Sequence, residues 1–207
     1  MASTEQTPKK PSRIQLRNRK RILEAALDVF SRHGYRGATL DQIAKEAGLS
    51  KPNILYYFGG KEEIHVTLLN QLMQSWLEPL EQLDPQGNPL DEILGYVRRK
   101  LEMTREFPRE SRLFANEILQ GAPRMAPHLE AGLKPLFDEK TALIQRWIDA
   151  GALASVDPRH LIFSIWSTTQ HYADFDAQVR VLTAGEGGML DGAGTYLDTM
   201  FRKLLTP

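Results

Sequence analysis

Cysteine is absent from this 207-residue sequence, and so are long apolar runs. Without cysteine there can be no disulfide framework, no thiolate metal site and no cysteine nucleophile. No stretch reaches the roughly 18 apolar residues that a membrane-spanning helix needs, and the basic N-terminal residues are not followed by an apolar segment. We therefore expect a protein that has no membrane partner and stays in the cytoplasm.

Strand patterns are also missing, because no convincing run of residues alternates between apolar and polar. Hydrophobic residues make up 42% of the chain and charged residues 25%, which are ordinary globular values and exclude a largely disordered chain. Apolar residues recur instead at spacings of three and four. This pattern predicts an all-α protein of about nine helices.

The net charge of the chain is zero, but the two signs are separated along it. Residues 1–58 hold 11 Lys and Arg against 5 Asp and Glu, a net charge of +6. Residues 59–207 hold 15 against 21, a net charge of −6. A basic segment beside an acidic one is expected when the first contacts a polyanion.

The basic segment carries the signals of three successive helices. A first amphipathic helix is predicted to end at Gly34. Thr39 stands three residues before Gln42, which is a capping box, and the second helix that it opens is stopped by Gly48. Ser50 is a good N-cap for a third helix after a very tight turn.

Two short helices joined by a tight turn, after a longer helix, predict a helix-turn-helix, whose second short helix enters the DNA major groove. The side chains agree with this interpretation. An amide such as Asn53 can hydrogen-bond an adenine edge, and Lys51 can bind a guanine edge or a phosphate. The alternative is a helical hairpin with a polar face in solvent, and the +6 charge of the segment argues against it.

Residues 40–64, LDQIAKEAGLSKPNILYYFGGKEEI, resemble the DNA-binding signature of the TetR family of bacterial regulators. The resemblance implies phosphate contacts from the second and third helices and from the start of the fourth, with base contacts from the third. The DNA-binding residues that we predict on this basis are Thr39, Ser50, Lys51, Asn53, Tyr56, Tyr57 and Lys61.

The same resemblance implies a domain organisation and partners. We expect a disordered basic arm over residues 1–14, a helix-turn-helix DNA-binding domain over 15–60, and a ligand-binding and dimerisation domain over 61–207. The helices expected near 157–179 and 189–205 would form the interface of a homodimer. A two-fold dimer would bind double-stranded DNA at a near-palindromic operator.

The second half narrows the resemblance, because residues 100–114 and 157–175 are similar to segments of the TetR-type repressors of pyrimidine utilisation. This implies repression that is released by uracil or thymine. A pyrimidine edge alternates N–H donors and carbonyl acceptors, which a Gln amide complements, and indoles can cover its faces. The ligand-binding residues that we predict are Trp76, Trp166 and Gln170. The same residue types at helical spacing would equally suit a helical core, and a TetR-type regulator of a different small ligand is the alternative function.

Enzyme and metal alternatives centre on His171 and Asp174, which are three residues apart in a predicted helix. They could serve a small all-α hydrolase or begin a metal site. Structural zinc normally takes four ligands, and the remaining candidates, His65, His128 and His160, are dispersed. Neither a nucleophile elbow nor a Gly-rich phosphate loop occurs. We therefore expect no enzymatic activity, no metal and no cofactor; a scaffold protein would explain the helices but not the separation of charge.

Overall fold

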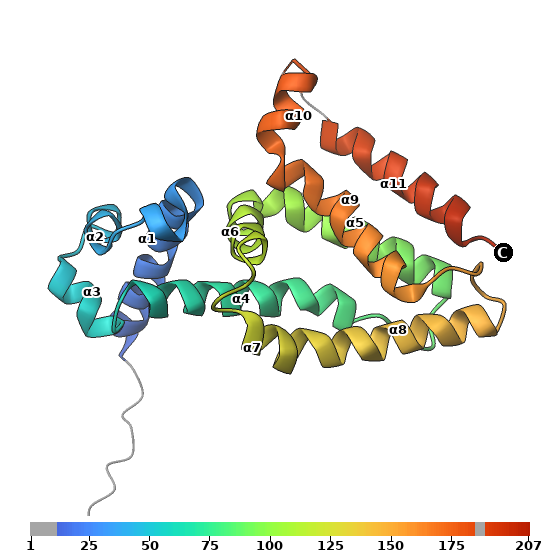
Figure 1. Ribbon diagram of the computed structural model, residues 1–207, viewed down its shortest axis with the longest axis horizontal. Helices are drawn as coiled ribbons and strands as arrows, with labels where there is room; N and C mark the ends of the chain where they lie inside the picture. The colour runs from blue at the N-terminus through green and yellow to red at the C-terminus, as the bar shows by residue number, and fades with distance from the viewer. Residues whose placement is uncertain (1–11, 185–188) are drawn as a thin grey trace, which may run out of the picture. The chain divides into compact units, whose positions relative to one another are not determined.

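The computed structural model describes residues 12–184 and 189–207, and within them every regular element is helical (Figure 1). The all-α prediction is thus confirmed. The elements are α1 (Arg13–Gly37), α2 (Leu40–Ala47), α3 (Lys51–Tyr57), α4 (Lys61–Glu81), α5 (Pro89–Glu106), α6 (Pro108–Leu119), α7 (Ala126–His128), the π-helix η1 (Leu129–Leu133), α8 (Lys134–Asp149), α9 (Pro158–Asp174), α10 (Asp176–Leu182) and α11 (Met189–Leu205).

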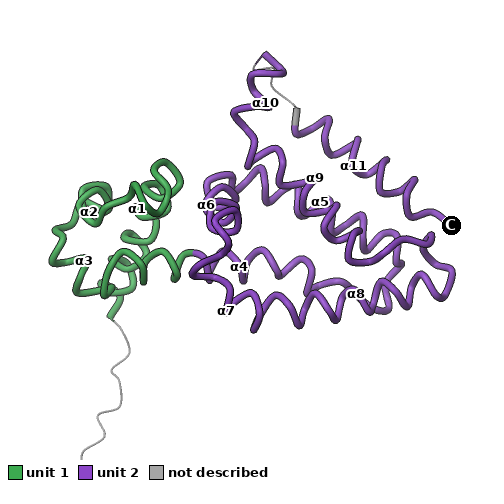
Figure 2. Tube along the Cα trace, viewed as in Figure 1, with its two compact units in different colours: residues 1–68 green, residues 69–207 purple. Residues whose placement is uncertain are grey.

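The chain divides into two compact units, residues 1–68 and 69–207 (Figure 2). The sequence suggested a boundary after residue 60, but the first two turns of α4 belong to the first unit. Ile64 is fully buried, and the ring of His65 lies edge-on to that of Phe30 with 4.8 Å between the centroids. Helix α4 therefore begins in one unit and ends in the other.

The start of α1 differs from the sequence prediction. Residues 1–11 of the expected arm lie outside the described residues, but residues 13 and 14 are helical. Ser12 caps the helix: its hydroxyl accepts a hydrogen bond from the backbone N–H of Gln15, and the Gln15 side chain accepts one from the N–H of Ser12. A Ser-x-x-Gln capping box in the sequence was the signal for this earlier start.

The helix-turn-helix is built by local signals that the sequence shows. The capping box of Thr39 and Gln42 opens α2, and the Ser50 hydroxyl accepts a hydrogen bond from Asn53 N–H at the start of α3. Gly48 ends α2 in the left-handed conformation, with φ +58°, and a Cβ there would come within 2.5 Å of Arg21 Nη2. The side chains that fill the core of this unit are Ile22, Phe30, Ile43, Ile54, Phe58 and Ile64.

Helix α5 is central to the second unit and packs against both α9 and α11, as Figure 1 also shows. The core around it takes side chains from the end of α4 and from α5, α8, α9 and α11. Asn88 and Asp157 cap α5 and α9 as their Asn-Pro and Asp-Pro pairs predict. The apolar run expected to continue to about residue 179 is interrupted at Phe175, whose backbone is not helical, so α10 is a separate helix.

Candidate DNA-binding surface and ligand site

Helix α3 turns its polar residues outward and anchors itself through one apolar residue. Ser50, Lys51 and Asn53 are exposed, and Tyr56 is 70% exposed, whereas Ile54 is fully buried. Thr39 is exposed at the N-cap of α2. The structure therefore presents these five predicted DNA-binding side chains to solvent on one unit.

The two tyrosines at the end of α3 are held by the first turns of α1. Asn18 Nδ2 donates to Tyr57 Oη at 2.9 Å, and Gln15 Nε2 donates to Tyr56 Oη at 3.2 Å. Because each phenolic oxygen accepts in these bonds, its own hydrogen is left to donate, as a phosphate oxygen requires. Helix α1 thus orients two of the predicted DNA contacts.

Lys51 already has an ionic partner. Its Nζ lies 2.9 Å from Asp41 Oδ2 of α2, and both side chains are exposed. An exposed ion pair is worth little in stability, so the ammonium can exchange this partner for a base edge or a phosphate.

Lys61 is engaged more firmly, and its placement differs from a free phosphate ligand. Its Nζ donates to the backbone carbonyls of Tyr35 and Ala38, each at 2.7 Å, and lies 4.4 Å from the centroid of the Tyr35 ring. These contacts tie the start of α4 to the last turn of α1 and to its C-cap, Ala38. No pattern in the sequence indicates this bracing role.

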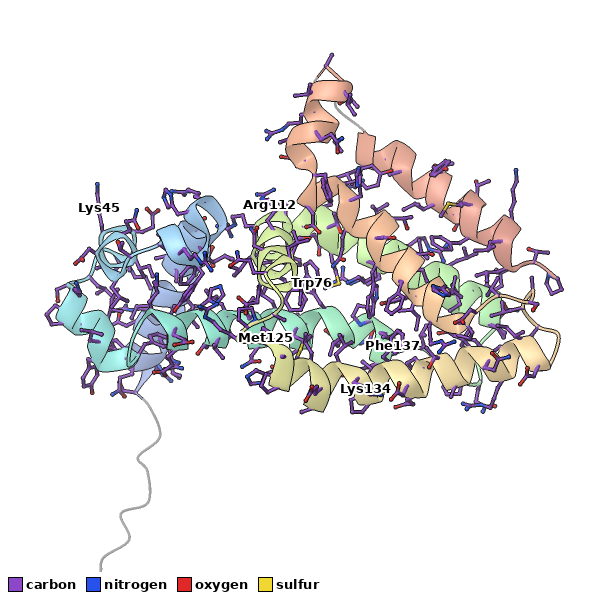
Figure 3. The ribbon with its side chains drawn as sticks, in the orientation of Figure 1. Lys45, Trp76, Arg112, Met125, Lys134 and Phe137 are labelled. Atoms are coloured by element: carbon purple, nitrogen blue, oxygen red, sulfur yellow. The ribbon has the colours of Figure 1, made fainter. Side chains whose placement is uncertain are left out.

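Trp76 and Trp166 lie in the second unit, at two levels of helix α5. Trp76 is 8% exposed on α4 and packs near Phe114 of α6, with 6.2 Å between ring centroids (Figure 3). Trp166 donates its indole N–H to the hydroxyl of buried Tyr96 at 2.6 Å. Trp76 instead meets Lys100, one turn further along α5, so the described contacts do not bring the two indoles face to face.

Gln170 is half-buried on α9, one turn after Trp166 and one turn before Asp174. The three residues share one stripe of the helix because they are spaced by four. Trp166 is tied to Tyr96 of α5, so this stripe runs along the contact between α9 and α5. The predicted amide thus lies between an aromatic pair and a charged pair.

The charged pair is Lys100 and Asp174, and the sequence reasoning missed the lysine. Lys100 is only 4% exposed and its Nζ lies 4.5 Å from the centroid of the Trp76 ring. Burial lowers its pKa to about 8, against the opposing attraction of Asp174. The available signal was its position: Lys100 follows Tyr96 by four residues, on the apolar face of α5.

Asp174 is partly buried and accepts a hydrogen bond from the hydroxyl of buried Ser111 at 2.5 Å. Burial raises the pKa of Asp174; the Ser111 hydrogen bond and the positive charges of Arg112, Lys100 and His171 oppose that rise. The His171 ring stacks on Phe175, with 5.0 Å between centroids.

Two further observations concern a metal site and a membrane-spanning helix. Within residues 12–184 and 189–207, no three His, Asp or Glu side chains gather as a metal-ligand set. No described helix has the length and hydropathy to cross a membrane.

Comparison with known proteins matches both units. The model of bacterial regulatory proteins of the tetR family matches residues 22–66, and that of the YcdC-like protein C-terminal region matches residues 69–202. The chain is 49% identical over 177 residues to the HTH-type transcriptional regulator RutR of Escherichia coli K12, covering 86% of this chain and 84% of that one.

Solved structures show the same fold at lower identity. A transcriptional regulator of Streptomyces coelicolor, SCO4942, superposes with a TM-score of 0.74 at 24% identity, covering 91% of this chain and 98% of that one. AibR, solved with isovaleryl coenzyme A and operator DNA, superposes with a TM-score of 0.70 at 18% identity, covering 92% and 99%.

The fold and these matches define a DNA-binding transcriptional regulator with an N-terminal helix-turn-helix and a larger helical domain. The chain belongs to the TetR family.

Proposed function

We propose that this regulator represses genes of pyrimidine utilisation and is released from its operator by uracil or thymine. The observation that carries the proposal is the 49% identity to RutR, in a match that covers 86% of this chain. A match of that extent includes most of residues 69–207, and so it covers the predicted ligand residues as well as the DNA-binding unit. No cofactor, metal or catalytic turnover is part of the proposed role, which is carried out in the cytoplasm.

The DNA-bound form is proposed to be a homodimer on a near-palindromic operator. Supporting features are large apolar side chains that the single chain leaves exposed on the helices expected at the interface. Phe163 of α9 and Tyr196 and Leu204 of α11 are such residues. Their pairing across a two-fold axis would cover this surface and present two copies of α3 to the DNA.

Release is proposed to act through α4, which carries Lys61 at its first residue and Trp76 in its last third. A ligand that contacts Trp76 and favours one position of this helix would change the position of the brace at Lys61. Only such a difference in affinity between two states can lower operator binding.

The test combines calorimetry with mapping of bound DNA. Uracil or thymine should give measurable heat of binding, which Gln170→Ala weakens by about 1–3 kcal/mol because a ligand edge loses its partner. Chromatin from cells grown with and without uracil should show occupancy of pyrimidine-breakdown promoters only without it. Occupancy that ignores uracil, with no heat from either base, would favour a TetR regulator of a different ligand.

A further inference from the structure

Lys100 is a charged side chain that lies nearly buried in the second unit. Its side chain is 4% exposed, and within the described residues its ammonium meets the Trp76 ring but no hydrogen-bond acceptor and no carboxylate within 4.0 Å. An ammonium has three donors, and leaving donors unpaired in a buried place is costly. A cation–π contact offsets only part of that cost.

Asp174 provides the complementary half. Ser111 fixes one carboxylate oxygen, Oδ1, at 2.5 Å. The described residues give the second oxygen no hydrogen bond, and the charge of Lys100 acts on Asp174 without forming a direct ion pair. Lys100 and Asp174 attract each other without closing an ion pair, so the packed helices α5 and α9 each keep one charged group available, and the donor lies over the Trp76 ring.

From this geometry we infer that Lys100 and Asp174 are the polar contacts of the effector site: the ammonium donates to a ring carbonyl, and the carboxylate accepts from an adjacent ring N–H. Trp76 covers one face of the same ring. The ligand class is a flat, neutral heterocycle with neighbouring carbonyl and N–H groups. The identification of this heterocycle as a pyrimidine rests on the proposed function. Gln170, one turn before Asp174 on α9, supplies a further amide to that edge.

Two charged side chains can bind a neutral ligand when the edge of that ligand carries a dipole. A lactam edge presents a dipole in which the oxygen is negative and the N–H hydrogen is positive, and hydrogen bonds to charged partners are about twice as strong as neutral ones. A group that lacks either half of the edge would leave a buried charge unpaired, which discriminates strongly against it. The site is therefore expected to reject a ring that is methylated on nitrogen.

The experiment is calorimetry of the full-length protein with uracil and with 1,3-dimethyluracil, which keeps the carbonyls and has no N–H. Lys100→Met and Asp174→Asn should each weaken uracil binding about 10- to 100-fold. The unmodified protein should bind 1,3-dimethyluracil at least tenfold more weakly than uracil, and Asp174→Asn should narrow that difference.

Lys140→Met is the matched control, because Lys140 is also buried, at 5% exposure, but lies on α8 with Glu139 at 3.0 Å. It should leave uracil affinity unchanged. Urea unfolding separates a binding role from a structural one: Lys100→Met should unfold at the same or higher urea concentration, since it removes a buried charge. Uracil affinity equal to that of the unmodified protein in both site variants would overturn the inference and leave the proposed function standing, whereas no heat with the unmodified protein overturns both.

Discussion

At the residue scale, the two lysines predicted to contact DNA have different surroundings. Lys51 shares an exposed ion pair with Asp41, while Lys61 donates two hydrogen bonds to backbone carbonyls at 2.7 Å. A residue type at a family position therefore does not fix its physical role. Lys51 is free to exchange partners, and Lys61 stabilises the fold of the unit that carries the DNA contacts.

Replacing Lys61 with Met should lower the free energy of unfolding of the N-terminal unit by about 2–3 kcal/mol, since two charge-assisted hydrogen bonds are lost. Urea unfolding followed by circular dichroism measures this. Lys45→Met is the control, because Lys45 is exposed on α2 and should change stability by less than about 0.5 kcal/mol. Equal stability of the two variants would show that the bonds of Lys61 contribute nothing to folding.

Replacing Asp41 with Asn should raise operator affinity several-fold, because Lys51 no longer has to leave an ionic partner and a repelling charge is removed. Gel-shift titration at a fixed salt concentration measures the effect. Glu46→Gln removes the same charge from the same helix without touching Lys51, so it controls for net charge. The role of the ion pair would be refuted by equal gains in the two variants.

At the element scale, helix ends could be predicted wherever a side chain caps them. Thr39 and Ser50 cap the helices that the sequence assigned to them, and Asn88 and Asp157, each followed by proline, cap α5 and α9. The break at Phe175 could not be foreseen, because neither glycine nor proline marks it in the sequence. The burial of Lys100 was missed because its environment is made by other helices.

Gly34 bends α1 where the sequence predicted the helix to end, with φ +65° and ψ 175°. That conformation is essentially restricted to glycine, so Gly34→Ala should lower the free energy of unfolding by about 1–3 kcal/mol although no atom lies within 4 Å of the new methyl group. Gly37→Ala, three residues on and without a positive φ, should change it by less than about 1 kcal/mol. Thermal unfolding of both variants checks the contrast, which would vanish if strain at Gly34 were unimportant.

At the scale of the whole molecule, zero net charge conceals a basic DNA-binding segment and an acidic remainder. This separation of charge, the fold class and the polar residues on the exposed face of α3 could all be predicted from the sequence. Tryptophan and glutamine suit a flat ligand, so Trp76, Trp166 and Gln170 could be proposed as ligand residues from the sequence. The proximity of Lys100 and Asp174 follows only when α5 and α9 are packed together.

The stability of the molecule should rise between pH 8 and pH 9.5 because of Lys100. Burial lowers its pKa to about 8 in the folded chain, from 10.5 when exposed, so the unfolded chain binds more protons in this window and its free energy rises relative to the folded chain. The gain is at most about 1.4 kcal/mol per pH unit, and Lys100→Met should remove it. Urea unfolding of the unmodified protein and of Lys100→Met at pH 7.5, 8.5 and 9.5 measures how the free energy of unfolding changes with pH. Parallel profiles for these two proteins would contradict the prediction. Above that range Tyr96 opposes the trend, because burial raises its pKa.

Helix α4 runs without a break from Lys61 to Glu81, and the division between the two units falls inside it. Each residue added to a helix rotates the downstream chain by about 100° and advances it by about 1.5 Å. An insertion of one residue in the middle of α4 would therefore turn the residues after it by about 100° relative to those before it, whereas an insertion of seven residues would restore nearly the original angular phase.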